Sequence, residues 1–483
     1  MFVKPFNIFM ILLITLFLIA CNPPKENEEE EEEEIVKKAY DVTTYVTLGD
    51  KSKLLEKQVD DQTVIDLNPS GIKLSIDPTI TYQQMDGFGA AMTESSAYVI
   101  SQLESDAKSD IMTSLFGESG IGISFVRLTI GASDFSLDNY TYNDTINNEP
   151  DLDLENFSIE RETTMLIPRL QEALVLNPSL KLMASPWSAP AWMKDNKHLN
   201  GGSLRDQYVD VFADYFVKYI QAFDAVGLDI YAVTPQNEPL HVTSGYPTMY
   251  MTIAQQIELI YAMGQKFEAN DIETLIMAYD HNWDRMDYPI SVLNSKAGPY
   301  TAGVALHGYG GNVSETSRIN NIFPDKGVWF TEISGGLWAT NFADNITWNM
   351  ENIFMGSINR GAKGVLMWNL ALDENNGPKN GGCTNCRGVV TINSQTGAIT
   401  KNEEYYMIGH FSKFVQVGAH RIGSTINSGN ILQSAFMNPD GSIVVVVHNK
   451  SKIPATFSLD IDGSQMQYSL PGQGTATFTL NSK

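Results

Sequence analysis

Two glutamates stand where a carboxyl group could do chemistry. Glu238 lies near the end of the apolar segment 230–239 (IYAVTPQNEP), and Glu332 follows the apolar start of segment 327–336 (GVWFTEISGG). A carboxyl group just past a buried strand is desolvated on one side and open on the other, which is where barrel enzymes place their chemistry. Two such groups about 5–5.5 Å apart could cleave a glycosidic bond with retention, one as acid/base and the other as nucleophile. A solvated surface charge or a helix cap, the alternative for either glutamate, fits this apolar context poorly.

Eight strand-like segments recur along the chain, and helical patterns lie between most of them. The alternation predicts an α/β fold, a (β/α)₈ TIM barrel, in which Glu238 ends the fourth strand and Glu332 the seventh. A doubly wound open sheet is the alternative, but no glycine-rich phosphate loop follows the first strand. The expected strands are residues 84–91, 123–131, 180–190, 230–239, 274–283, 303–309, 327–334 and 364–372. The helical patterns are residues 159–176, 204–226, 253–268, 344–360 and 403–417.

The pattern changes after about residue 417. Short alternating runs broken by Asn, Gly, Asp and Pro predict an antiparallel β-sandwich there; they are residues 430–437, 442–449, 455–460 and 475–480. The early runs 42–48 and 72–76 are expected to join it, so this side domain is discontinuous and built from both termini. The predicted parts are residues 39–80 for the N-terminal strands, 81–417 for the barrel and 418–483 for the C-terminal sandwich.

The N-terminus predicts a lipoprotein. Residues 1–21 carry Lys4, an apolar stretch and the tetrapeptide LIAC, which resembles a bacterial lipobox with Cys21 as the lipidated residue. An ordinary signal peptide is the alternative. Residues 22–38 contain eight glutamates and are expected to form a disordered tether, either a spacer or a surface-export signal. The expected location is the outer membrane, exposed at the cell surface, with the lipid as the only membrane contact; a periplasmic or secreted protein is the alternative.

Charge restricts the partners. The net charge is −25, and setting aside Lys4, Lys25 and the eight tether glutamates leaves −19 on the remainder. Such acidity argues against nucleic acid and anionic membrane surfaces and fits a neutral polysaccharide. No metal-ligand cluster or phosphate loop is evident, so no cofactor is expected.

Two cysteines, Cys383 and Cys386, lie in the sequence NGGCTNCRG. In an oxidising compartment a local disulfide is expected. A structural zinc would need two more ligands, and a redox role would need a thioredoxin-like context. The loop follows the eighth predicted strand, so a bridge would stiffen the leaving-group side of the site.

Several motifs, in the same order along residues 82–421, resemble glycoside hydrolase family 30. They are GFGAAMTE at 87–94, ASPWSAP at 184–190, TPQNEP at 234–239, FTEIS at 330–334, WNLAL at 368–372 and YMIGHFSKF at 406–414. That family includes glucosylceramidases and microbial β-1,6-glucanases. The resemblance implies that Glu238 is the acid/base and Glu332 the nucleophile. The first must then stay protonated near neutral pH, and the second must stay ionised.

The resemblance and the rim between residues 368 and 387 favour a retaining β-glycosidase, acting as a monomer on β-1,6-glucan or β-1,6-glucosyl branches. Glucosylceramide is the runner-up substrate, and xylan or galactan remains possible because loops set specificity. A non-catalytic glycan-binding lipoprotein is the alternative of a different class.

The remaining expected site residues lie at strand ends. Arg127 is expected to donate to Glu332, or else to form a structural ion pair, and Asn237 to hold the sugar 2-hydroxyl. Further substrate contacts, as walls or hydrogen-bond partners, are expected from Asp134, Trp187, His307, Tyr309, Trp368 and Asn369, with Tyr309 also touching the nucleophile. The candidates for outer subsites are Trp192, His241, Tyr246, His281 and Trp283.

Overall fold

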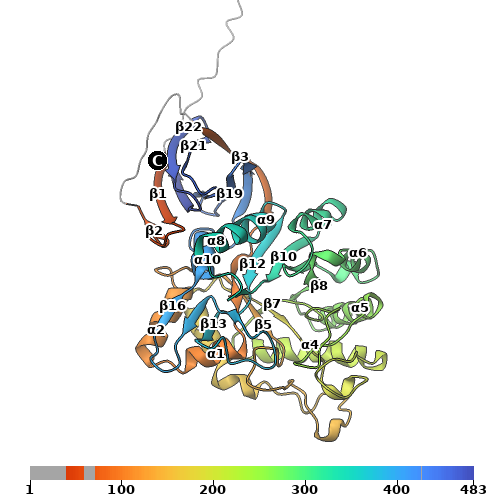
Figure 1. Ribbon diagram of the computed structural model, residues 1–483. Helices are drawn as coiled ribbons and strands as arrows, with labels where there is room; N and C mark the ends of the chain where they lie inside the picture. The colour runs from red at the N-terminus through yellow and green to blue at the C-terminus, as the bar shows by residue number, and fades with distance from the viewer. Residues whose placement is uncertain (1–39, 59–70, 426, 483) are drawn as a thin grey trace, which may run out of the picture. The chain divides into compact units, whose positions relative to one another are not determined.

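The structure is a computed structural model that describes residues 40–58, 71–425 and 427–482 (Figure 1). The predictions for the signal segment, for Cys21 and for the acidic tether fall outside these residues. Among the residues described, no helix has the length and apolar character needed to cross a membrane.

A closed barrel of eight parallel strands forms the centre of the fold. Seven of the predicted segments contain one strand each, and the eighth, 364–372, overlaps β12, which begins two residues earlier. The prediction of a (β/α)₈ barrel is therefore confirmed. Side chains that point into the barrel, among them Phe125, Met183 and Trp329, fill its interior as a buried cluster. The strands are β4 (Gly87–Ala91), β5 (Phe125–Thr129), β6 (Lys181–Ser185), β7 (Ile230–Val233), β8 (Leu275–Asn282), β9 (Gly303–His307), β10 (Gly327–Glu332) and β12 (Ala362–Met367).

Helices surround this barrel (Figure 1). They pack on it through apolar faces. In α4, Phe212, Phe216 and Phe223 lie on one face and are buried, as the helical pattern predicts. In contrast α1 was not predicted, because its buried residues include Ser95 and Ser96 and give no apolar period. The helices are α1 (Glu94–Ser101), α2 (Ser105–Phe116), α3 (Leu166–Leu176), α4 (Val209–Asp224), α5 (Ile253–Ala269), α6 (Asp287–Leu293), α7 (Thr316–Ile322), α8 (Phe342–Asn349), α9 (Met355–Ile358) and α10 (Glu403–Ser412).

The side domain is built from both ends of the described chain, as predicted. The N-terminal strand β1 pairs along its length with the last strand, β23, and β3 lies between β17 and β21. Apolar residues of these strands share one buried cluster. Four strands, β2, β17, β18 and β22, were not predicted. The strands are β1 (Tyr40–Thr47), β2 (Glu56–Lys57), β3 (Ile72–Gln84), β17 (His420–Ser424), β18 (Asn427–Ser428), β19 (Ile431–Met437), β20 (Ile443–Asn449), β21 (Ala455–Ile461), β22 (Ser464–Leu470) and β23 (Thr475–Ser482).

Two small sheets follow barrel strands and form part of the rim. One pairs β11 (Gly335–Gly336), just after Glu332, with β14 (Cys386–Arg387). The other contains β13 (Ala371–Asp373), β15 (Val390–Ile392) and β16 (Ile399–Lys401). The first sheet joins the segment after the seventh barrel strand to the cysteine loop.

Candidate active site

The two glutamates converge at the carboxyl-terminal mouth of the barrel. Glu332 is the last residue of β10, and Glu238 lies five residues beyond β7. One carboxylate oxygen of each and a ring nitrogen of His307 lie within 4.8 Å of one another. This separation fits the roughly 5–5.5 Å of retaining enzymes and is below the roughly 6.5–9.5 Å of inverting ones.

The backbone at Glu238 is held in a conformation that L-residues rarely adopt. Its φ is 44°, and its N–H donates to the carbonyl oxygen of Asp280 at 2.9 Å. A non-glycine residue in the left-handed region persists only where its surroundings enforce it, and such residues gather at functional sites. This hydrogen bond to the backbone of β8 therefore helps to aim the Glu238 side chain.

Arg127 lies at the centre of the site and is wholly buried. Its Nη1 bonds Oε2 of Glu332, while its Nη2 donates to Oδ1 of Asn237 and to Oδ2 of Asp280, each at 2.7 Å. Burial opposes the charge, but the two carboxylates outweigh it and raise the pKa of Arg127. The guanidinium is therefore a fixed cation that contacts Glu332, as the sequence suggested.

Asp280, which the sequence reading missed, is the acceptor that holds the network together. It lies in an irregular stretch of β8, where the register with β9 shifts and both Tyr279 and Asp280 have positive φ. Burial would raise its pKa, but Arg127 and His307 bring the pKa far below the usual range. Its two oxygens face donors from five other strand positions: Arg127 of β5, Ser185 of β6, Thr234 just past β7, His307 of β9 and Thr331 of β10.

His307 lies between Asp280 and Glu238 and contacts both. Its Nδ1 lies 3.2 Å from Oε1 of Glu238, and its Nε2 lies 2.9 Å from Oδ1 of Asp280. Burial opposes the charged ring, but Glu332 and Asp280 outweigh it and raise the pKa of His307 to about 9. The ring is thus positioned to donate from Nδ1 to an ionised Glu238.

The resulting charge balance differs from the sequence expectation. Burial raises the pKa of Glu238, but the hydrogen bond and charge of His307 outweigh it and lower that pKa. Burial and the charge of Glu238 raise the pKa of Glu332 against the charges of His307 and Arg127. Glu332 is therefore the harder of the two to ionise. This order was not predicted, because the sequence does not show that His307 lies beside Glu238.

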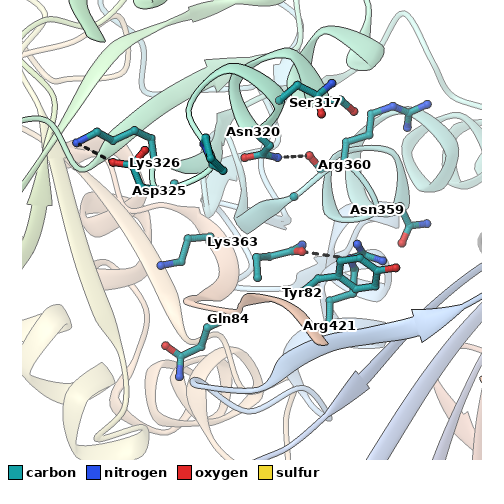
Figure 2. A pocket seen from close by; sticks show the side chains of 15 residues that line it. Tyr82, Gln84, Ser317, Asn320, Asp325, Lys326, Asn359, Arg360, Lys363 and Arg421 are labelled. Carbon is teal, nitrogen blue, oxygen red and sulfur yellow. Dashed lines mark hydrogen bonds and ion pairs between the residues drawn. The ribbon is translucent and has the colours of Figure 1, made fainter. Parts of the chain in front are cut away.

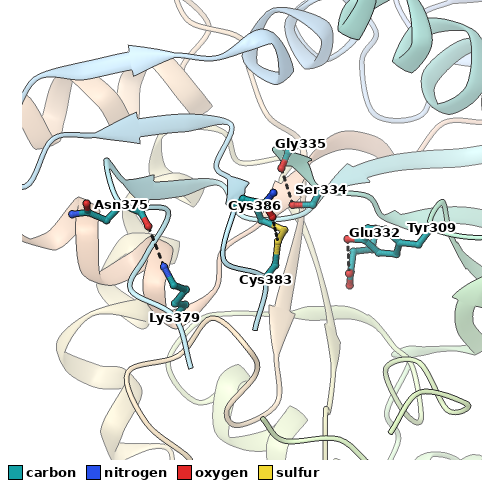
Figure 3. Close-up of a disulfide and its surroundings, with 9 residues drawn as sticks. Tyr309, Glu332, Ser334, Gly335, Asn375, Lys379, Cys383 and Cys386 are labelled. Carbon is teal, nitrogen blue, oxygen red and sulfur yellow. Dashed lines mark hydrogen bonds between the residues drawn. A yellow bond between two sulfur atoms is a disulfide. The ribbon is translucent and has the colours of Figure 1, made fainter. Parts of the chain in front are cut away.

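Tyr309 and Arg127 together occupy both oxygens of Glu332. The Tyr309 hydroxyl donates to Oε1 at 3.0 Å, so the expected contact with this glutamate is present (Figure 3). The spacing of Glu238, His307 and Glu332 could also suit a metal ion. Since Arg127 already bonds Oε2, the positive charge beside this carboxylate comes from a side chain.

Trp187 and Trp368 form an aromatic wall beside Arg127. Their rings stack at 5.1 Å, and the guanidinium lies 4.9 Å from the first ring and 5.5 Å from the second. Cys386 belongs to the same buried cluster, and Cys383 packs against it. The two cysteines form the predicted disulfide, drawn in Figure 3, so the bridge braces this wall from the rim loop.

Two other expected contacts occupy different environments. Asp134 is partly exposed; burial, Glu332 and Glu238 raise its pKa, which places it close to the two catalytic candidates. Asn369 is wholly buried, and its Oδ1 accepts a hydrogen bond from the hydroxyl of Thr93 at 3.0 Å. This bond ties Asn369 to the start of α1.

The outer-subsite candidates divide into buried and rim residues. Trp192 and Trp283 are 1% and 3% exposed within the main core, so their prediction as outer subsites is wrong. His281 lies beside Glu238, with Nε2 3.8 Å from Oε1. His241 bonds the Tyr246 hydroxyl at 2.9 Å in the loop after β7.

A cavity of about 610 Å³ lies at the other end of the barrel, where β3 ends and β10 and β12 begin (Figure 2). Its cations already have partners. Arg421 lies 3.7 Å from the centre of the Tyr82 ring, and Lys326 donates to the carbonyls of Gly298 and Thr301. Asp325 is the one acidic residue among those that line it, so this cavity lacks the paired carboxyl groups of the mouth.

Family models, curated relatives and a solved structure were compared with this chain, and all of them point to one family. The model of the glycosyl hydrolase family 30 TIM-barrel domain matches residues 85–415, and that of the family 30 β-sandwich domain matches residues 418–478. The endo-1,6-β-D-glucanase BGN16.3 of Trichoderma harzianum is 37% identical over 445 residues, which are 85% of this chain and 87% of that protein. The mouse lysosomal acid glucosylceramidase is 31% identical over 450 residues, 85% of this chain and 83% of that protein. The solved endo-β1,6-glucanase BT3312 has a TM-score of 0.84 and 35% identity, covering 91% of this chain and 99% of that one.

The buried Arg127 network predicts a large loss of stability when its cation is removed. Arg127→Met leaves Asp280 and Glu332 as buried carboxylates without their shared partner, so we expect the free energy of unfolding to fall by about 3–5 kcal/mol. Arg285→Met is the control, because Arg285 pairs with Asp287 on the surface and its loss should change stability little. Urea unfolding at neutral pH measures both. Equal changes in the free energy of unfolding for the two substitutions would show that the buried network does not contribute to stability as proposed.

Proposed function

This chain belongs to glycosyl hydrolase family 30, and from that premise we propose that it hydrolyses β-1,6-linked glucan with retention at the anomeric carbon. The observation that carries the proposal is the approach of Glu238 and Glu332 to within 4.8 Å at the barrel mouth. The choice of linkage is supported by relatives that are named endo-1,6-β-glucanases and share 35–37% identity, against 31% for the mouse glucosylceramidase.

In the first step, Glu332 attacks the anomeric carbon while the bond to the leaving oxygen breaks. Arg127 and Tyr309 each hold one oxygen of Glu332, which fixes the attacking carboxylate in place. Asn237 accepts from Arg127 through Oδ1, so its Nδ2 is the group that can donate to the sugar 2-hydroxyl. The product of this step is a glucosyl ester of Glu332 and a free leaving hydroxyl.

The proton for the leaving oxygen comes from Glu238. His307 faces both Glu238 and the anionic Asp280, so a proton on Nδ1 can pass to Glu238 and leave a neutral ring still bonded to Asp280. In the second step Glu238 takes a proton from water, whose oxygen displaces Glu332 from the sugar. Two displacements restore the β-configuration.

The substrate and the stereochemistry can be tested together. The purified protein is incubated with pustulan, gentiobiose, laminarin and glucosylceramide, and the products are identified by chromatography and early ¹H NMR. We expect cleavage of the β-1,6-linked substrates, a β-anomer as the first product, and a loss of turnover on the order of a thousandfold in Glu332→Gln. Cleavage of glucosylceramide alone, or of xylan or galactan in a wider panel, would contradict the linkage. Binding without turnover would indicate a glycan-binding protein.

His307 is predicted to set the pH range of activity. It lowers the pKa of both Glu238 and Glu332, so His307→Gln should raise both. Activity requires an ionised Glu332 and a proton on the His307–Glu238 pair, and the His307 pKa of about 9 places that proton on His307. In His307→Gln the acid limb of the pH profile of kcat/KM should therefore move to higher pH, whereas the alkaline limb should move to lower pH because Glu238 alone must hold the proton. Rates on gentiobiose from pH 4 to 9 provide the measurement. An alkaline limb that stays in place or moves to higher pH would show that His307 does not hold the catalytic proton.

We also propose that the protein is a monomer held at the outer membrane by lipid on Cys21. The support is the sequence at residues 1–21, which lies outside the described structure. In a bacterial host supplied with radioactive fatty acid, the protein should incorporate label, and Cys21→Ala should not. Equal labelling of both would rule out this anchor, and a dimer mass in light scattering would rule out the monomer.

A further inference from the structure

A cavity of about 710 Å³ lies beside the segment that follows Glu332, and of its lining residues the mechanism above uses only Tyr309. Tyr309, which bonds Glu332, forms one side, and Ile333 to Gly335 continue the lining directly after the glutamate. Pockets of roughly 300–1,000 Å³ are the usual size for small ligands. The cavity thus borders the catalytic centre through Tyr309.

Two tryptophans in this cavity are exposed. Trp338 is 56% exposed and Trp348 is 48% exposed, whereas the other five tryptophans of the chain are buried. Exposed large aromatic rings beside a reactive centre mark a binding surface rather than a core. Asn341 and Asp344 line the same cavity, so its walls combine flat apolar faces with polar groups. A sugar ring needs both, because its C–H faces pack on aromatic rings and its hydroxyls form hydrogen bonds.

Trp338 packs against the backbone of Gly336. Its ring lies so close to Gly336 that a Cβ there would meet ring carbons at 2.0 Å. Gly336 pairs with Cys386 in the small rim sheet, and the Leu337 N–H donates to the carbonyl oxygen of Asn385 at 2.9 Å. Figure 3 shows the disulfide next to Gly335 at the start of this segment. The cysteine loop therefore braces the strand that carries the tryptophan.

We propose that this cavity is an outer subsite in which Trp338 and Trp348 bind a further glucose unit of the chain being cleaved. This assignment rests on the proposed function, since it needs a glucan as substrate. Its occupant is a sugar ring of the same chain, because the cavity borders the catalytic centre and its lining combines two aromatic rings with polar groups.

The test compares chain substrates with a minimal one. Trp338→Ala, Trp348→Ala, Trp338→Phe and the double alanine variant are assayed on gentiotetraose, octyl β-glucoside and p-nitrophenyl β-glucoside. For each alanine variant we expect the ratio of kcat/KM on gentiotetraose to that on the nitrophenyl glucoside to fall about tenfold, mainly through KM. Trp338→Phe keeps an aromatic face and should lose less. Tyr82→Ala is the control, since Tyr82 is 47% exposed at the opposite end of the barrel and should keep the wild-type ratio.

Three results would overturn the assignment. An unchanged ratio in the double alanine variant would show that neither ring binds the chain. A selective loss on octyl β-glucoside would show that the cavity binds an alkyl group. A wild-type protein that cleaves neither gentiotetraose nor pustulan would remove the proposed function, and the subsite with it, before any variant is compared.

Discussion

The site depends on one buried ion pair, between Arg127 and Asp280. Taking two charges out of water costs several kcal/mol per ion, roughly, so such a pair persists only where every remaining donor and acceptor is satisfied. Here hydroxyls from β6, β10 and the end of β7 complete the shell of Asp280, and Glu332 and Asn237 complete that of Arg127. The position of the Glu332 carboxylate thus follows from the same network that satisfies the buried charges of Arg127 and Asp280.

The barrel is what makes this network possible. Six of its eight strands supply a partner at or near their carboxyl ends, and no local segment could bring those groups together. The irregular backbone at Asp280 and the positive φ of Glu238 are local distortions that aim two acidic side chains into one space. The rim is a separate layer: the disulfide loop supports both the aromatic wall of Trp187 and Trp368 and the segment that carries Trp338.

Much of this arrangement could be predicted from the sequence, and what was missed has physical reasons. The eight strands could be predicted because each is a short apolar run, whichever strand it pairs with. Glu238 and Glu332 stand out because each follows such a run. Asp280 ends such a run too, but a backbone irregularity, which alternation does not encode, turns it inward. Trp338 was missed because its place depends on Gly336 pairing with Cys386, 50 residues away. The relative pKa values of the two glutamates depend on His307, whose position between Glu238 and Asp280 is set by three different strands.

The central claim is that this network presents Glu332 to the anomeric carbon. A 2-deoxy-2-fluoro-β-glucoside with a good leaving group slows the breakdown of the sugar ester, so the attacking residue stays labelled and can be identified by mass spectrometry of peptides. The account predicts one label per chain, on the peptide that contains Glu332. A label on Glu238 or on any other residue would contradict it.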